Sequence, residues 1–80
     1  MEPIEITVCF KPSGEIVPES LSWDGKVCKV ESTGRQWQTG DGLHILITLM
    51  DGFACELLWA KFNNLWYVLN VKKSPWGEHI

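Results

Sequence analysis

The chain has 80 residues, of which 45% are hydrophobic and 21% are charged, and its formal net charge is −3 at pH 7. This balance is typical of one small globular domain. The seven basic residues are scattered and no apolar run approaches the roughly 18 residues of a membrane span, so the sequence argues against double-stranded DNA and against a membrane as partners.

Turn signals divide the chain into short segments. Asp24-Gly25 and Asp51-Gly52 are each flanked by apolar runs, and Asp-Gly is a strong signal for a tight β-hairpin turn. Ser13-Gly14 and Asn63-Asn64 are further candidate turns, and the glycine-rich residues 39–42 form a longer loop. The spacing of these turns leaves room for five or six short strands.

The N-terminal half contains three of the expected strands. Residues 4–10 alternate apolar and polar side chains, which is typical of a half-buried strand. Residues 15–23 contain Pro18, so this segment is either an edge strand or a strand broken at the proline. Residues 26–32 form the third strand, which we expect to continue toward Trp37 after a kink at Gly34.

The C-terminal half is more apolar. Residues 43–50 are apolar on both faces, which predicts a central strand. Residues 53–60 alternate apolar side chains on one face with a mixed set on the other. Residues 65–71 are nearly all apolar or aromatic, so we expect them to form a second central strand or a strand of the barrel. Residues 56–62 could form one helical turn, but the segment is too short to be an independent helix.

These segments predict an all-β fold. We expect five or six antiparallel strands in a small barrel or a strongly bent sheet, of the size of an SH3 domain and with little or no helix. Closure would remove exposed strand edges. Residues 1–73 should form one domain, and residues 74–80 a flexible C-terminal tail.

The three cysteines are Cys9, Cys28 and Cys55. Their odd number and wide spacing argue against a disulfide framework, and the N-terminus lacks the features of a signal peptide, so we expect a reducing, cytoplasmic location. No two cysteines lie close enough in sequence for a structural zinc site, and free cysteines are commonly buried. We therefore expect core thiols, with no metal and no other cofactor.

Catalytic motifs are missing from the sequence. His44 follows the glycine-rich loop, and we interpret it as a partly exposed histidine at a strand end. Glu56 alternates with apolar neighbours, so it either faces solvent or is a buried acid with a partner. Because no nucleophile is paired with a base and no motif of a hydrolase or metalloprotease is found, we do not expect an enzyme.

The five tryptophans are the main candidates for binding. Trp23, Trp59 and Trp66 lie in apolar strands and should belong to the core. Trp37 has polar neighbours, among them Arg35, and is the best candidate for an exposed binding residue. The candidate binding set comprises Arg35, Trp37, His44, Lys72, Lys73 and Trp76.

The hairpins also carry a resemblance to a known family. The pattern consists of Ser22-Trp23-Asp24-Gly25-Lys26, Val30, Trp37, His44-Ile45-Leu46-Ile47, Asp51-Gly52, Glu56-Leu57 and Asn64-Leu65-Trp66-Tyr67-Val68. It resembles DUF6504, a family of small all-β domains of unknown function, over residues 4–71. The chain departs from the family pattern at Lys26, where members have arginine, and at Cys55, where they have tyrosine. Some members resemble appendages of Y-family polymerase-like proteins, and this likeness implies company with nucleic acids or replication.

Two functions remain open on the sequence alone. The first is a non-catalytic module that binds a protein partner or associates with itself through a groove or an exposed strand edge. The alternative is a domain that binds single-stranded nucleic acid by stacking bases on Trp37 and Trp76 beside Arg35 and the Lys72-Lys73 pair.

Overall fold

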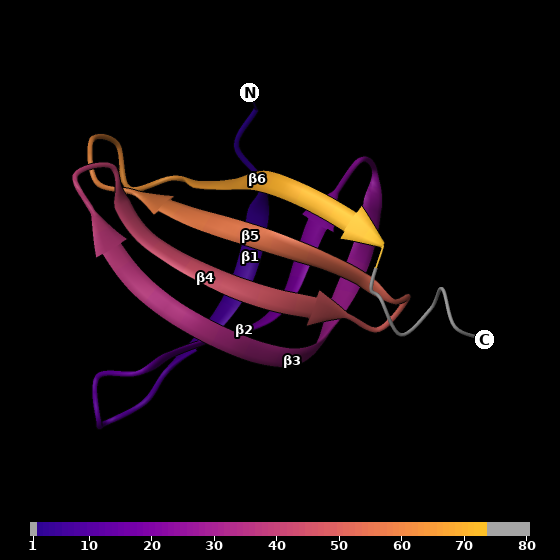
Figure 1. Cartoon of the computed structure of the whole chain (residues 1–80), viewed down its shortest axis with the longest axis horizontal. Coiled ribbons are helices and arrows are strands. Elements are labelled where there is room, and N and C mark those ends of the chain that lie inside the picture. The colour runs from indigo at the N-terminus through magenta and orange to yellow at the C-terminus, as the bar shows by residue number, and fades with distance from the viewer. Residues whose placement is uncertain (1, 74–80) are drawn as a thin grey trace.

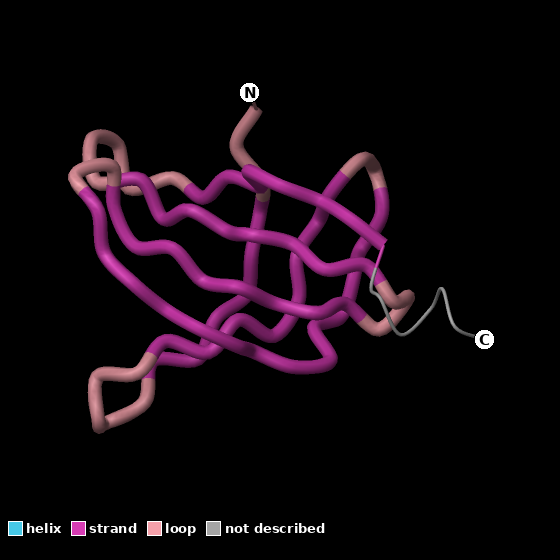
Figure 2. The backbone as a smooth tube through the Cα atoms, in the orientation of Figure 1, coloured by secondary structure: helices cyan, strands magenta, loops and turns pink. Residues whose placement is uncertain are grey.

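The computed structural model describes residues 2–73, apart from the side chain of Lys73. The predicted tail, with Trp76, lies outside the described residues. Within the described range the chain forms six strands and no helix (Figures 1 and 2), which confirms the all-β prediction. The strands are β1 (Glu5–Phe10), β2 (Ile16–Trp23), β3 (Lys26–Thr39), β4 (Gly42–Leu49), β5 (Phe53–Ala60) and β6 (Trp66–Lys73).

The strands follow one another in a meander. Each strand pairs antiparallel with the next along the chain, in the spatial order β1-β2-β3-β4-β5-β6. The first four residues of β3 pair with β2, whereas the rest of β3 pairs with β4. Because β3 belongs to both halves, it joins two layers, and Figure 1 shows β1 and β2 crossing behind β4 and β5.

Two irregularities bend β3. The register with β4 shifts between Val30 and Ser32, and again between Thr33 and Gln36. Each shift leaves β3 with extra residues that have no partner on β4, and such bulges bend a strand and increase its twist. The second shift spans Gly34, so the predicted kink at this glycine is confirmed.

Pro18 marks the point where β2 separates from β3. β2 lies between β1 and β3, so the alternative of an edge strand is wrong. Pairing with β3 begins only at Ser20. On the other side Pro18 lies opposite Val8, next to a bulge at which Glu19 of β2 has no partner on β1. The proline therefore interrupts the ladder toward β3 without ending the strand, which is consistent with its missing N–H.

The outer strands of the meander meet at one point. The Ile4 N–H donates to the Trp66 carbonyl oxygen at 2.8 Å, which gives an isolated antiparallel bridge. β1 and β6 form no ladder with each other, so the structure is a strongly bent sheet and not a closed barrel. Beyond the bridge, β6 has a described neighbour only on its β5 side. The prediction that residues 65–71 form a central or barrel-forming strand is therefore wrong, because the apolar side chains of an outer strand also pack against the core.

The core lies between the two layers. On β4 and β5 every second side chain is buried there, and the cluster is completed by residues of β2 and β6; its members are Ile16, Leu21, Ile45, Ile47, Leu49, Cys55, Leu57 and Trp66. Trp23 and Trp59 are half-buried and pack against this cluster, and the Trp59 ring stacks on that of Trp66 with 5.5 Å between the ring centroids. The prediction that these three tryptophans belong to the core is confirmed.

Burial of Cys55 predicts a pH-dependent stability. Burial raises the pKa of the Cys55 thiol from 9.0 to about 11, and the charges of Asp51 and Cys28 act in the same direction. Since the folded pKa lies above the unfolded one, this stabilisation is complete below pH 9 and is lost as the pH rises through 11. We expect the free energy of unfolding to fall by up to about 3 kcal/mol over this interval, measured by urea denaturation.

The Cys55→Ala variant is the control for this prediction. Other titrating groups contribute equally to both proteins, so the difference between their free energies of unfolding at each pH reports Cys55 alone.

Alkylation by iodoacetamide at pH 8 gives a second test of the burial of Cys55. The exposed Cys9 should react in the folded protein, whereas the buried Cys55 should react only on unfolding. Equal alkylation rates for the two thiols would contradict the prediction.

Candidate functional site

The candidate site is the face of the β3–β6 sheet that points away from the core, which we call the outer face. Since Ile45, Ile47 and Leu49 point into the core, alternation places His44, Leu46 and Thr48 on the outer face. On β5 the same alternation places Ala54, Glu56 and Leu58 there. None of the described strands packs over this face, which is turned toward the viewer in Figure 1.

A polar relay ties the four strands of the outer face together. His44 Nδ1 lies 2.8 Å from Glu56 Oε2, and His44 Nε2 lies 2.8 Å from Thr39 Oγ1. Asn70 Nδ2 donates to the other carboxylate oxygen, Glu56 Oε1, at 3.1 Å. Because a carboxylate only accepts hydrogen bonds, Nδ1 of His44 carries a proton, and in the neutral ring Nε2 accepts from the Thr39 hydroxyl.

For the residues of this relay, the structure overturns the prediction about His44 and decides between the two alternatives for Glu56. His44 is 7% exposed, so the prediction of a partly exposed histidine is wrong. Trp37 on β3 stacks on its ring, and Leu58 on β5 lies directly opposite it in the ladder. Glu56 is the paired acid of the two alternatives, and its side chain is 19% exposed. Every buried side-chain nitrogen and oxygen in the described residues has a hydrogen-bond partner.

The order hydroxyl–imidazole–carboxylate is also used by nucleophilic hydrolases. In this protein the Thr39 hydroxyl, which donates to His44, also accepts a hydrogen bond from the Asp41 N–H at 3.2 Å, and this bond lies within the β3–β4 turn. The imidazole is covered by Trp37. These contacts give Thr39, His44 and Glu56 a structural role, which is to connect neighbouring strands.

Trp37 lies at one side of the outer face. Its indole is stacked on the His44 imidazole, with 5.1 Å between the ring centroids and an angle of 9° between the planes. The Arg35 guanidinium carbon lies 5.2 Å from the Trp37 ring centroid, in a cation–π contact. The structure therefore gathers three of the predicted binding residues into one cluster, in which Trp37 is half-buried.

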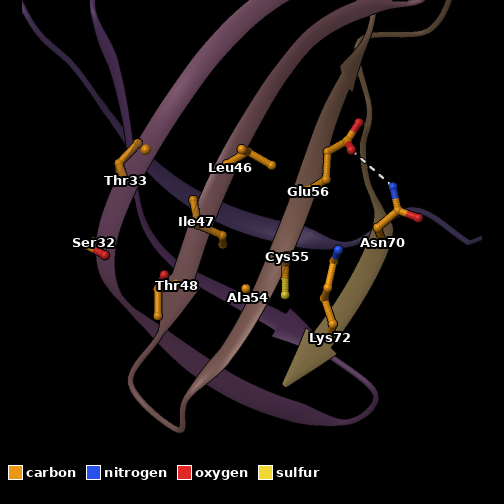
Figure 3. Close-up of a pocket in the computed structure, with 11 residues that line it drawn as sticks. Ser32, Thr33, Leu46, Ile47, Thr48, Ala54, Cys55, Glu56, Asn70 and Lys72 are labelled. Carbon is orange, nitrogen blue, oxygen red and sulfur yellow. Dashed lines mark hydrogen bonds between the residues drawn. The ribbon is translucent and has the colours of Figure 1, made fainter. Parts of the chain in front are cut away.

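A hollow extends across the outer face beside this cluster (Figure 3). Its volume is about 660 Å³, within the range of ligand sites in proteins. All four strands contribute to its lining, with Ser32, Thr33, Gly34, Leu46, Thr48, Ala54, Glu56, Asn70 and Lys72. Ile47 and Cys55 also border it, although their side chains are buried and belong to the core. The small side chains of Gly34, Thr48 and Ala54 make the surface recede here.

Most residues that line the hollow could not be recognised as binding residues from the sequence. Leu46, which is one of the residues that line it, is 39% exposed. The available signal was the apolar character of residues 43–50 on both faces, which predicted a central strand but also an apolar outer face.

On the outer face the acidic side chain has hydrogen-bond partners, whereas the described basic side chains have no ionic partner. Both oxygens of Glu56 are used within the relay, by His44 and Asn70. Among the described residues, neither Arg35 nor Lys72 forms an ion pair. Lys72 lines the hollow on the β6 side (Figure 3). Arg35 belongs to β3, which lies three strands away in the sheet. The remaining predicted binding residues, the Lys73 side chain and Trp76, lie outside the described part of the chain.

Comparison with known proteins adds no family. No protein-family model, no curated protein and no solved structure matches the chain. The resemblance to DUF6504 therefore stays a prediction. Within residues 2–73 there is no group of three or more histidine, cysteine or acidic residues arranged to hold a metal ion, and no helix long and apolar enough to cross a membrane.

Proposed function

We propose that the protein is a non-catalytic binding module that engages a protein partner through the outer face. The observation that carries this proposal is the apolar character of a sheet face that no described element covers. A solvated face of an antiparallel sheet normally carries polar side chains, whereas this one carries the exposed Leu46 in the hollow and the half-buried rings of Trp37 and Tyr67 outside it. Burying these side chains against a partner would stabilise a complex.

The relay supports the same proposal. Tryptophan and arginine dominate the energetics of many interfaces, and here Trp37 and Arg35 are held in place by His44 and its hydrogen bonds. An anchor that is already ordered loses less conformational entropy on binding, which increases affinity. The three free thiols support a reducing, cytoplasmic location for this module.

Binding of single-stranded nucleic acid is the competing proposal. It is favoured by the presence of Arg35, Trp37 and Lys72 on one face. Two observations weigh against it. The Trp37 ring already stacks on His44, and the two cations lie on opposite sides of the face without a continuous cationic track between them.

The test compares Leu46→Gln with Val27→Gln. Leu46 lies in the hollow, whereas Val27 is 77% exposed and lies on the β2–β3 ladder, away from the outer face. Both substitutions replace an exposed apolar side chain by the same neutral one. We expect Leu46→Gln to reduce recovery of a specific protein partner about tenfold in affinity capture with quantitative mass spectrometry, and Val27→Gln to leave it unchanged.

Other outcomes would contradict the proposal. Equal recovery of every protein by both variants would exclude the outer face as the interface. Saturable, salt-sensitive quenching of tryptophan fluorescence by oligo-dT would support nucleic-acid binding instead. Sedimentation velocity of the parent chain, over a wide concentration range, shows whether the partner is a second copy.

A further inference from the structure

The charges of the outer face carry information about the partner. Arg35 and Lys72 have no carboxylate partner among the described residues, and the one carboxylate in the hollow is fully hydrogen-bonded within the relay. The hollow and the cluster of Arg35 and Trp37 therefore offer two available cations to a partner, whereas their one carboxylate is already hydrogen-bonded, although the whole chain has a net charge of −3. Charge complementarity of this kind selects an acidic partner.

The surface between the two cations is not cationic. Lys72, Ala54, Thr48 and Ser32 form one row across the four strands. Leu46 and Gly34 lie next to this row, on the side toward Trp37. A segment that contacts both cations must therefore cross a strip made of hydroxyl groups, small side chains and one leucine, which favours apolar residues between its acidic ones.

The sheet geometry gives the spacing. Three strand separations span about 14 Å from β6 to β3, and Arg35 lies about 9 Å farther along β3 than the row that contains Lys72. The two cations are thus separated diagonally by roughly 17 Å at the backbone, which corresponds to four to six residues of extended chain. Because the paired side chains of both partners are long, the bound segment can be shorter than the backbone distance alone would require. Only an even spacing places both acidic side chains on one face of an extended segment.

We propose that the outer face binds an extended peptide segment with two carboxylates four or six residues apart and an apolar side chain between them. The carboxylates pair with Arg35 and Lys72, and the apolar side chain occupies the hollow over Leu46. This inference rests on the proposed function, because it specifies the partner of the same face. A nucleic acid fits less well, since its regularly spaced phosphates would also meet the carboxylate of Glu56.

A selection from a random peptide library tests the inference. Twelve-residue peptides displayed on phage are selected on the full chain and counter-selected on Leu46→Gln. We expect the enriched sequences to share two acidic residues at the stated spacing around an apolar residue. Synthetic peptides of the enriched sequence should lose at least tenfold in affinity for an Arg35→Glu/Lys72→Glu double variant.

Lys26→Glu/Lys29→Glu is the matched control. It changes the net charge by the same amount, at two exposed residues of β3 that pair with β2 and lie outside the outer face. We expect this control to bind the peptides within about twofold of the parent chain at physiological salt, because charges farther apart than about 8 Å are largely screened. Near-UV circular dichroism confirms that the variants are folded.

The outcomes separate this inference from the proposed function. Enriched peptides that lack acidic residues but still depend on Leu46 would overturn the proposal of an acidic partner. They would leave the outer face as the proposed binding site. Equal loss of affinity in both double variants would overturn the local pairing with Arg35 and Lys72. No enrichment that depends on Leu46 would overturn both proposals, and binding of oligo-dT lost only in the Arg35/Lys72 variant would assign the two cations to a nucleic acid.

Discussion

Replacing Gly42 by alanine is expected to destabilise the protein by about 3–5 kcal/mol. Gly42 begins β4 with a φ of +145°, a backbone conformation that L-residues rarely adopt. A Cβ atom at this position would overlap the Trp59 carbonyl oxygen and crowd the Lys61 backbone nitrogen. Because the obstacles are backbone atoms of the neighbouring strand, they can move only if the β4–β5 ladder is distorted. Urea denaturation measures the loss.

Gly40→Ala is the control for this prediction. Gly40 lies in the same turn, and an added Cβ would meet no atom within 4 Å. We expect a change in the free energy of unfolding within about 0.5–1 kcal/mol, the usual effect of alanine at an unstrained glycine. An equally small effect at Gly42 would show that the β3–β4 turn adapts to a side chain.

Removal of the His44 side chain should have the second-largest effect. His44→Ala leaves the half-buried carboxylate of Glu56 without its charge-assisted hydrogen bond and exposes one face of Trp37. We expect a loss of about 2–4 kcal/mol in the free energy of unfolding, since an unpaired buried charge is costly. A double-mutant cycle with Glu56→Ala should give a coupling energy of about 1–3 kcal/mol between the two side chains.

The pair of Lys11 and Glu15 provides a comparison on the surface. Its nitrogen and oxygen are 3.9 Å apart and the two side chains are about half exposed, at 51% and 54%. Lys11→Ala should change stability by less than about 1 kcal/mol, as is usual for exposed ion pairs. A coupling energy near zero between His44 and Glu56 would show that their contact follows from the sheet register without stabilising it.

Much of the fold could be predicted because its signals are local. The Asp-Gly pairs lie at two of the observed hairpin turns, and the alternation of residues 53–60 matches β5. Residues 43–50 were expected in the centre of the sheet because they are apolar on both faces, and β4 lies between β3 and β5. The kink at Gly34 followed from the glycine itself.

The parts that could not be predicted depend on register between strands. His44 and Glu56 are 12 residues apart, and whether they meet depends on the pairing that the turn at Asp51-Gly52 sets between β4 and β5. Their burial likewise depends on Trp37, which lies opposite His44 because the β3–β4 turn pairs Thr39 with Gly42. Whether the strands close into a barrel or remain an open bent sheet depends on the curvature of the whole sheet, which no local sequence pattern specifies.

The meander also bears on how the chain folds. Each ladder joins segments that are adjacent in the sequence, so every pairing step closes only a short loop. A meander avoids pairings between strands that are far apart in the sequence, and this favours faster folding than an all-β fold with crossover connections. Hairpins can therefore form one after another as the chain leaves the ribosome, and the contact of Ile4 with Trp66 must wait until the segment from β1 to the start of β6 has been synthesised.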